Sequence, residues 1–99
     1  MNLLETKLKS VLSQFFRDQY YSQAVKELRK SLSNQSSYAE HWEQIVRMIL
    51  AKELSNPLDF VHNIANQVLD DNSDDEAYKW LNLMLINSLG SENSMIIEY

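Results

Sequence analysis

The densest group of chemically active side chains in this sequence is a run of carboxylates near residue 70. Asp70, Asp71, Asp74, Asp75 and Glu76 place five acidic groups within seven residues. Like charges at this spacing repel one another, so the fold or a ligand of opposite charge has to offset the repulsion. The run therefore predicts either a solvated junction between helices or a surface that binds a basic partner.

A calcium-binding loop is a sharper interpretation of these carboxylates, but the spacing argues against it. Such a loop needs Gly at its sixth position and Glu at its twelfth. Counted from Asp70, those positions hold Asp75 and Leu81. The chain has no cysteine, and neither His41 nor His62 stands at a zinc-binding spacing. We therefore expect no dedicated metal site and no cofactor.

His62 is the best candidate for acid–base catalysis, because it lies one helical turn from Asp59. Catalysis also needs a nucleophile or an oxyanion donor, and the neighbouring sequence supplies neither. His41 flanks an apolar helical stripe, so we expect it at the boundary of the core. The chain has one glycine, which excludes a glycine-rich loop that cradles phosphate. The sequence thus predicts a protein that is not an enzyme.

Aromatic residues are the usual anchors of protein interfaces, so each is a candidate contact. Trp42 and Trp80 fall within apolar helical runs, which favours the core for both. Tyr20 and Tyr21 close a turn between helices, and we expect one of them to be exposed. Tyr78 lies one turn beyond the first acidic residues of its helix, and we expect it to be the aromatic contact beside the carboxylates.

The basic residues of the sequence give little reason to expect direct binding of nucleic acid. Lys26, Arg29 and Lys30 cluster on one predicted helix, with Glu27 among them. Three cations are too few for phosphate-driven affinity in a chain whose net charge is −5. We therefore interpret the cluster as the solvated side of its helix.

Apolar residues that recur every three or four positions predict five helices that position these groups. The predicted helices cover about residues 3–18, 22–32, 37–50, 56–69 and 73–89. The fifth is apolar nearly all round, so we expect it to be central. The tail, residues 91–99, carries three apolar side chains and is expected to dock as a short strand or turn.

Four of the predicted helix ends have specific signals. Residues 37–40 and 73–76 each form a capping box, in which a Ser precedes a Glu by three positions. Asn56 caps the fourth helix, and Pro57 fits its first position. Gly90 is expected to end the fifth helix in the left-handed conformation.

The fourth helix is predicted to have an apolar and a polar side. Leu58, Val61, Ile64, Ala65, Val68 and Leu69 are expected to face the core. Asp59, His62, Asn63, Asn66 and Asp70 are expected on the opposite side. Asp70 and Asp71 would then stand at the carboxyl end of this helix, where the helix dipole disfavours a negative charge. That excess charge favours a binding role.

The composition sets the class of protein. The 99 residues include 44% hydrophobic residues, one glycine and one proline, which predicts a compact, all-α, single domain over residues 1–99. No run of about 18 apolar residues and no secretion signal is found, so we expect a cytoplasmic protein. Residues 1–52 carry eight basic and five acidic side chains, whereas residues 53–99 carry one basic and nine acidic.

Two segments resemble the small all-α immunity proteins of bacterial contact-dependent growth inhibition systems. Residues 12–20, LSQFFRDQY, resemble the opening segment of that family, in which paired aromatics precede polar residues and another aromatic. Residues 78–81, YKWL, followed by apolar residues as far as Leu89, resemble its closing helix. The resemblance implies a cytoplasmic bacterial antitoxin that binds the toxin domain of a delivered effector, commonly a nuclease.

These observations lead to one hypothesis and one alternative. The protein is expected to be a monomer that binds a basic nuclease toxin, with no direct contact to nucleic acid or membrane. The expected contact residues are Asp59, Asn63, Asn66, Asp70, Asp71, Asp74, Asp75, Glu76 and Tyr78. The alternative is a helical adaptor or regulator that binds a host protein through an apolar groove.

Overall fold

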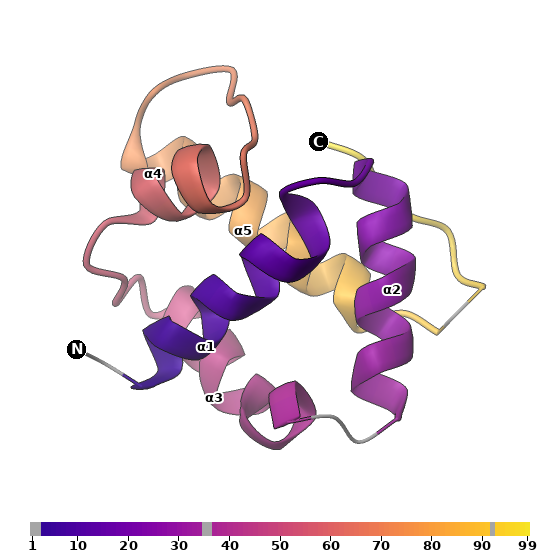
Figure 1. Cartoon of the computed structure of the whole chain (residues 1–99). Coiled ribbons are helices and arrows are strands. Elements are labelled where there is room, and N and C mark those ends of the chain that lie inside the picture. The colour runs from indigo at the N-terminus through magenta and orange to yellow at the C-terminus, as the bar shows by residue number, and fades with distance from the viewer. Residues whose placement is uncertain (1–2, 35–36, 92) are drawn as a thin grey trace.

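The computed structural model describes residues 3–34, 37–91 and 93–99, without the side chains of residues 37–40 (Figure 1). In chain order its elements are α1 (Leu3–Val11), the π-helical turn η1 (Leu12–Phe16), α2 (Tyr21–Ser33), α3 (Ser37–Leu50), α4 (Pro57–Asp59), the π-helical turn η2 (Phe60–Ile64) and α5 (Asp74–Ser88). Each π-helical turn directly continues the α-helix before it, so the described residues form five helices and no strand. The predicted all-α class is confirmed.

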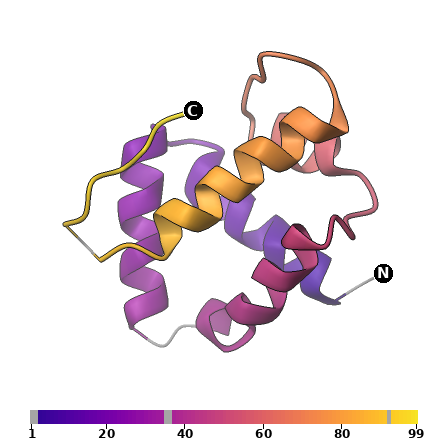
Figure 2. The same ribbon diagram turned by 180° about the vertical axis from the view of Figure 1, so that it is seen from behind.

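Helix α5 contacts α2, α3, α4 and η2 and so lies at the centre of the fold. Its Trp80 is buried, and the ring packs edge-on against Phe16 of η1 and Tyr21 of α2, with centroids 5.4 and 5.9 Å apart. Trp42 is also buried, whereas Tyr20 is exposed. The predictions for both tryptophans and for the tyrosine pair are confirmed. Figure 2 shows α5 from its outer side, which none of the other described helices crosses.

The buried apolar side chains come from every helix and form one cluster. The radius of gyration is 12.3 Å, close to the value of about 12.6 Å typical of a compact domain of this length. A single core of this kind holds the helix ends in fixed positions, including those that carry the carboxylates.

The cap at Asn56 forms as predicted, and so does the Ser73 half of the second capping box, whereas the Glu76 carboxylate binds Tyr99 instead of the Ser73 backbone. The Asn56 side chain accepts a hydrogen bond from the Asp59 backbone N–H at 3.3 Å, with Pro57 at the first helical position. The Ser73 hydroxyl accepts one from the Glu76 backbone N–H at 3.2 Å. The predicted capping box at residues 37–40 depends on side chains outside the described part of the chain.

The fourth helix ends earlier than predicted, at Ile64. Asn66 follows in the left-handed conformation, with φ of 56°, and the Gln67 N–H donates back to the Val61 carbonyl at 2.9 Å. Asn adopts this conformation more readily than most residues, so it can close a helix where Gly usually does. The chain then leaves the helical path, and Val68 is 87% exposed. The prediction that Val68 faces the core is wrong.

Gly90 and Arg29, which lie against each other, also differ from the predictions. No glycine of the chain has a positive φ, so Gly90 is not a left-handed cap. A Cβ at Gly90 would lie 2.6 Å from Arg29 Nη2, so a larger residue at this position would require the guanidinium group to shift. Arg29 is 4% exposed, whereas its neighbours Lys26 and Lys30 are exposed. The interpretation of all three cations as solvated is therefore wrong for Arg29.

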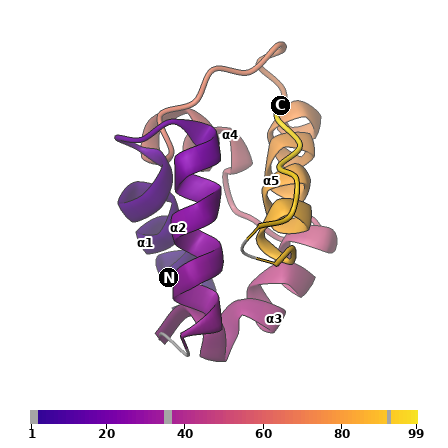
Figure 3. The same cartoon turned by 90° about the vertical axis from the view of Figure 1, so that its right-hand side faces the viewer.

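The tail docks on the body of the molecule, as predicted. Figure 3 shows it running alongside α5, on the side of the molecule where α2 lies. Ile96 packs against the core cluster, and Asn87 of α5 hydrogen-bonds to Ile97. The described tail residues hold to the helices through side chains of α2 and α5 instead of pairing as a strand.

Candidate functional site

The carboxylates lie where the loop of residues 65–73 enters α5, at one end of the molecule (Figure 1). Asp70, Asp71, Asp74 and Asp75 are all exposed. Together with Glu76 we call them the acidic surface. Asp74, Asp75 and Glu76 occupy the first turn of α5, where the helix dipole stabilises each negative charge by about 0.3–1 kcal/mol.

Asp70 and Asp71 have no such stabilisation. The sequence predicted that they stand at the carboxyl end of the fourth helix, which is wrong because η2 ends at Ile64. They lie in the loop, so the helix dipole neither favours nor opposes their charge. Folding therefore explains part of the acidic surface, and these two exposed carboxylates are the part that it does not explain.

Tyr99 of the tail connects the two parts of the acidic surface. Its hydroxyl oxygen accepts a hydrogen bond from the Asp70 backbone N–H at 3.0 Å, and its O–H donates to the Glu76 carboxylate. Partial loss of hydration raises the pKa of the Tyr99 phenol, the bond from Asp70 N–H lowers it, and the bond to Glu76 with the nearby negative charges raises it further. The net direction is upward, so this hydroxyl keeps its proton at neutral pH and can donate.

Two lysines offset part of the negative charge. Lys52 Nζ lies 3.9 Å from the Asp75 carboxylate and 5.9 Å from the centre of the Tyr78 ring. Lys79 Nζ lies 3.9 Å from the Glu76 carboxylate. Both ammonium groups are exposed, so each pair contributes little to stability. The five carboxylates still outnumber the two cations, and the surface stays acidic.

Asp59 and Asn63 form a separate polar group on α4 and η2. Asn63 Nδ2 donates to the Asp59 carboxylate at 2.6 Å, and Arg17 donates to the Asn63 backbone carbonyl at 3.1 Å. The charged side chain next to this polar group is therefore that of Arg17, which follows η1. Among the described residues, no hydrogen bond or ion pair joins this group to the acidic surface.

Asn66 and Tyr78, both predicted as contact residues, also have structural roles. Asn66 is exposed, but its left-handed backbone is what turns the chain out of η2. Tyr78 is 6% exposed, and its hydroxyl accepts a hydrogen bond from the Leu54 backbone N–H at 3.1 Å. Tyr78 shares the inward side of α5 with Leu81 and Leu85, one turn apart. Tyr78 was predicted as the aromatic contact beside the carboxylates, and its burial leaves little of its ring accessible at that surface.

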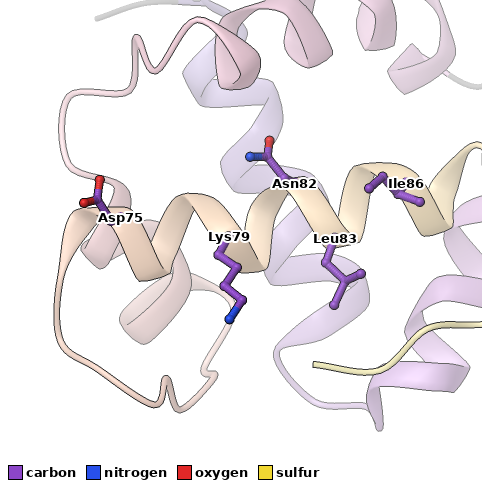
Figure 4. A pocket seen from close by; sticks show the side chains of 5 residues that line it. All are labelled: Asp75, Lys79, Asn82, Leu83 and Ile86. Carbon is purple, nitrogen blue, oxygen red and sulfur yellow. The ribbon is translucent and has the colours of Figure 1, made fainter.

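An open groove of about 440 Å³ runs along the outer side of α5 (Figure 4). Asp75, Lys79, Asn82, Leu83 and Ile86 line it. Figure 4 shows Lys79 and Leu83 pointing to one side of the helix and Asn82 and Ile86 to the other. Ile86 is 59% exposed. The groove therefore begins at the acidic surface and continues over apolar side chains.

Neither histidine is paired with a carboxylate among the described residues. His62 is half-buried, and its Nε2 has no hydrogen-bond partner among the described residues. Asp59, its proposed acid–base partner, binds Asn63 instead. His41 is half-buried, which confirms its place at the core boundary. Within the described ranges, no three acidic or histidine residues converge as a metal site, and no helix is long and apolar enough to cross a membrane.

Two exposed apolar residues belong to this region and were not predicted. Val68 stands two positions before Asp70 in the loop, and Ile86 lies in the groove. A sequence signal existed only for Val68: Asn66 and the polar residues around it could have marked an early helix end. Ile86 sits in a helix that is apolar on nearly every side, so periodicity could not separate its outer face from its inner one.

The fold and the site together define a small all-α domain that presents an acidic surface next to an apolar groove. Comparisons with protein-family models, with curated proteins and with solved structures found no match to this chain.

Proposed function

We propose that the protein is a bacterial immunity protein that binds a basic nuclease toxin and covers its active-site cleft. The observation that carries this proposal is the exposure of Asp70 and Asp71 next to Asp74 and Asp75, in a loop where folding does not require them. The protein would act in the cytoplasm, as a monomer until it meets the toxin.

The proposed partner follows from charge complementarity. A nuclease holds the phosphates of its substrate with Lys and Arg side chains, so its cleft is positive. An acidic surface can occupy that cleft and compete with the substrate. Opposite potentials also speed the encounter, with association rate constants approaching about 10⁸–10⁹ M⁻¹s⁻¹ at low salt. Fast association suits an antitoxin, which must act before the toxin cleaves its target.

Apolar residues beside the acidic surface would supply the remaining affinity. Stable interfaces combine buried apolar anchors with a polar rim. Val68, which is 87% exposed, stands next to the acidic surface in the chain, and Ile86 continues the groove away from it. The acidic surface would then set the association rate constant, and Val68 and Ile86 would set the dissociation rate constant.

Co-expression with the gene product encoded immediately upstream tests the proposal. If that gene encodes a very large exported protein, its C-terminal domain should co-purify with this chain. RNA cleavage by that domain should be lost on addition of the chain. The matched control is the variant with Asp70, Asp71, Asp74 and Asp75 each replaced by Asn, which should inhibit at higher concentration only. A domain that neither binds nor is inhibited would contradict the proposal.

The alternative function, a helical adaptor that binds a host protein, rests on the groove along α5. Leu83 and Ile86 give that groove an apolar lining. An adaptor of this kind would lose its partner on Ile86→Asp substitution and keep it when Asp70 and Asp71 become Asn. An immunity protein would be impaired by both changes, and by the acidic-to-amide change chiefly in its association rate.

A further inference from the structure

The docked tail has one main-chain side that α5 satisfies and one that faces away from α5. Asn87 of α5 donates from Nδ2 to the Ile97 carbonyl at 2.7 Å, and its Oδ1 accepts from the Ile97 N–H at 2.9 Å. A single side-chain amide reaches both groups of one residue when they point to the same side, as they do in an extended strand. The N–H and C=O groups of the two neighbours, Ile96 and Glu98, therefore point to the opposite side.

These groups of Ile96 and Glu98 form a short strand edge, which we call the outer edge. No hydrogen bond between described residues uses them. The tail's other contacts lie elsewhere, because Arg29 donates to the carbonyls of Ser94 and Met95 at 2.8 and 3.4 Å. A row of unpaired N–H and C=O groups along an extended segment is a template for pairing with another strand.

Apolar side chains flank the outer edge. Met95 is 84% exposed and Ile97 is 49% exposed, whereas Ile96 between them packs against the core. This alternation is that of a strand with one face covered and the other bare. A strand that paired with the outer edge would also bring its own side chains against Met95 and Ile97, and such cross-strand pairs stabilise a sheet.

The outer edge leads directly into the acidic surface. Tyr99 follows Glu98, and its hydroxyl contacts the Asp70 backbone N–H at 3.0 Å and the Glu76 carboxylate. Glu98 is itself exposed. A strand paired here would lie beside several carboxylates, so charge complementarity favours Lys or Arg in it and disfavours Asp or Glu. One basic partner can therefore cover the outer edge and the acidic surface together.

We propose that an edge β-strand of the toxin pairs with the outer edge of the tail. This contact rests on the proposed function, because its partner is the same basic toxin. The strand would accept from the N–H groups of Ile96 and Glu98 and donate to their carbonyls. It would place an apolar side chain opposite Ile97 and a Lys or Arg beside Glu98. In strand addition of this kind, main-chain bonds give affinity and the alternate side chains give specificity.

Glu98→Pro tests the pairing. Proline has no N–H to donate, but it is tolerated at a strand edge whose N–H faces solvent, so the tail should stay docked. Glu98→Ala is the matched control, because it removes the same carboxylate and keeps the N–H. In stopped-flow measurements with the toxin domain encoded immediately upstream, the Pro variant should dissociate at least about tenfold faster than the Ala variant. The Ala variant should dissociate at nearly the wild-type rate.

Hydrogen exchange measured by NMR gives a second test, on the wild-type chain. In the free chain the Ile97 N–H, which is bound to Asn87, should exchange slowly, and the Ile96 and Glu98 N–H groups should exchange fast. In the complex with the toxin domain all three should exchange slowly. Slow exchange at Ile97 in the free Glu98→Pro variant would establish that its tail is still docked.

The outcomes separate the strand pairing from the proposed function. Equal dissociation rate constants for the Pro and Ala variants, or unchanged exchange at Ile96 and Glu98 in the complex, would overturn the pairing alone. The acidic surface would then remain as the toxin contact. A toxin domain that does not bind the wild-type chain would overturn the proposed function and the strand pairing together.

Discussion

The Tyr99 hydroxyl donates a hydrogen bond to the Glu76 carboxylate and thereby ties the tail to the first turn of α5. The same oxygen accepts from the Asp70 backbone N–H at 3.0 Å. One side chain thus holds the loop and the helix of the acidic surface in a fixed relation. A preformed arrangement of charges loses less conformational entropy on binding than a mobile loop does.

Replacing Tyr99 with Phe should loosen the loop. The substitution keeps the ring and removes the hydroxyl, so the Asp70 N–H loses its acceptor. We expect severalfold faster hydrogen exchange at Asp70, measured by NMR, with the exchange of buried α5 amides unchanged. Tyr20→Phe is the control, because Tyr20 is 88% exposed. Unchanged exchange at Asp70 would show that Tyr99 does not order the loop.

The stability of the protein at alkaline pH should depend on Tyr21. Burial raises the pKa of its phenol above the ordinary value of 10.0, against the lowering effect of the hydrogen bond from Asn87. The unfolded chain therefore loses this proton at lower pH than the folded chain does. The stabilisation is complete below pH 10.0 and is lost as the pH rises through the folded-state pKa.

Denaturant unfolding at a series of pH values measures this effect. Above pH 10.0 the free energy of unfolding should fall more steeply for the wild type than for Tyr21→Phe. The lysines titrate in both proteins, so their contribution cancels in the difference. Parallel curves would mean that the folded-state pKa of Tyr21 is not raised.

Lys52→Gly should stabilise the protein. Lys52 follows α3 in the left-handed conformation, with φ of 57°, and the Lys52 and Glu53 N–H groups donate to the carbonyls of Ile49 and Met48 at 3.0 and 3.1 Å. Glycine adopts this conformation without the steric penalty of a Cβ, so the free energy of unfolding should rise by about 0.5–1 kcal/mol. Lys52→Ala removes the same ammonium group and keeps the strained backbone. Equal stability of the two variants in urea would show that the left-handed backbone at Lys52 is not strained.

Gly90→Ala should destabilise the protein by about 1–2 kcal/mol. The new Cβ would lie 2.6 Å from Arg29 Nη2, so the guanidinium group has to move away from its carbonyl partners. Urea unfolding measures the loss, and the NMR signal of Arg29 Nε–H should shift. Asn93→Ala changes an exposed tail residue and is the control. A Gly90→Ala variant as stable as the control would show that Arg29 does not restrict the space at position 90.

Local patterns were sufficient to predict much of the fold. The caps at Asn56 and Ser73 depend on residues three positions apart, and both form as predicted. The burial of Trp42 and Trp80 follows from apolar runs of a single helix. Caps and apolar runs depend on residues that are close together in the sequence, so they can be predicted without knowledge of the tertiary structure.

Contacts between distant segments could not be predicted in this way. Arg29 is buried because the tail, 65 positions later in the chain, covers it. The Tyr78 hydroxyl accepts a hydrogen bond from the Leu54 backbone N–H, 24 positions earlier in the chain, and Tyr99 reaches Glu76 from the tail. For the candidate site, the sequence identified the exposed aspartates but not which aromatic residue orders them.

The central claim is that the acidic surface drives binding to a basic toxin. Stopped-flow association of the chain with the toxin domain encoded immediately upstream, between roughly 50 and 500 mM salt, tests it most directly. The wild-type rate constant should fall steeply as salt rises, and the variant with Asn at positions 70, 71, 74 and 75 should associate slowly with a nearly flat salt dependence. Equal rate constants and equal salt dependence for the two proteins would contradict the claim.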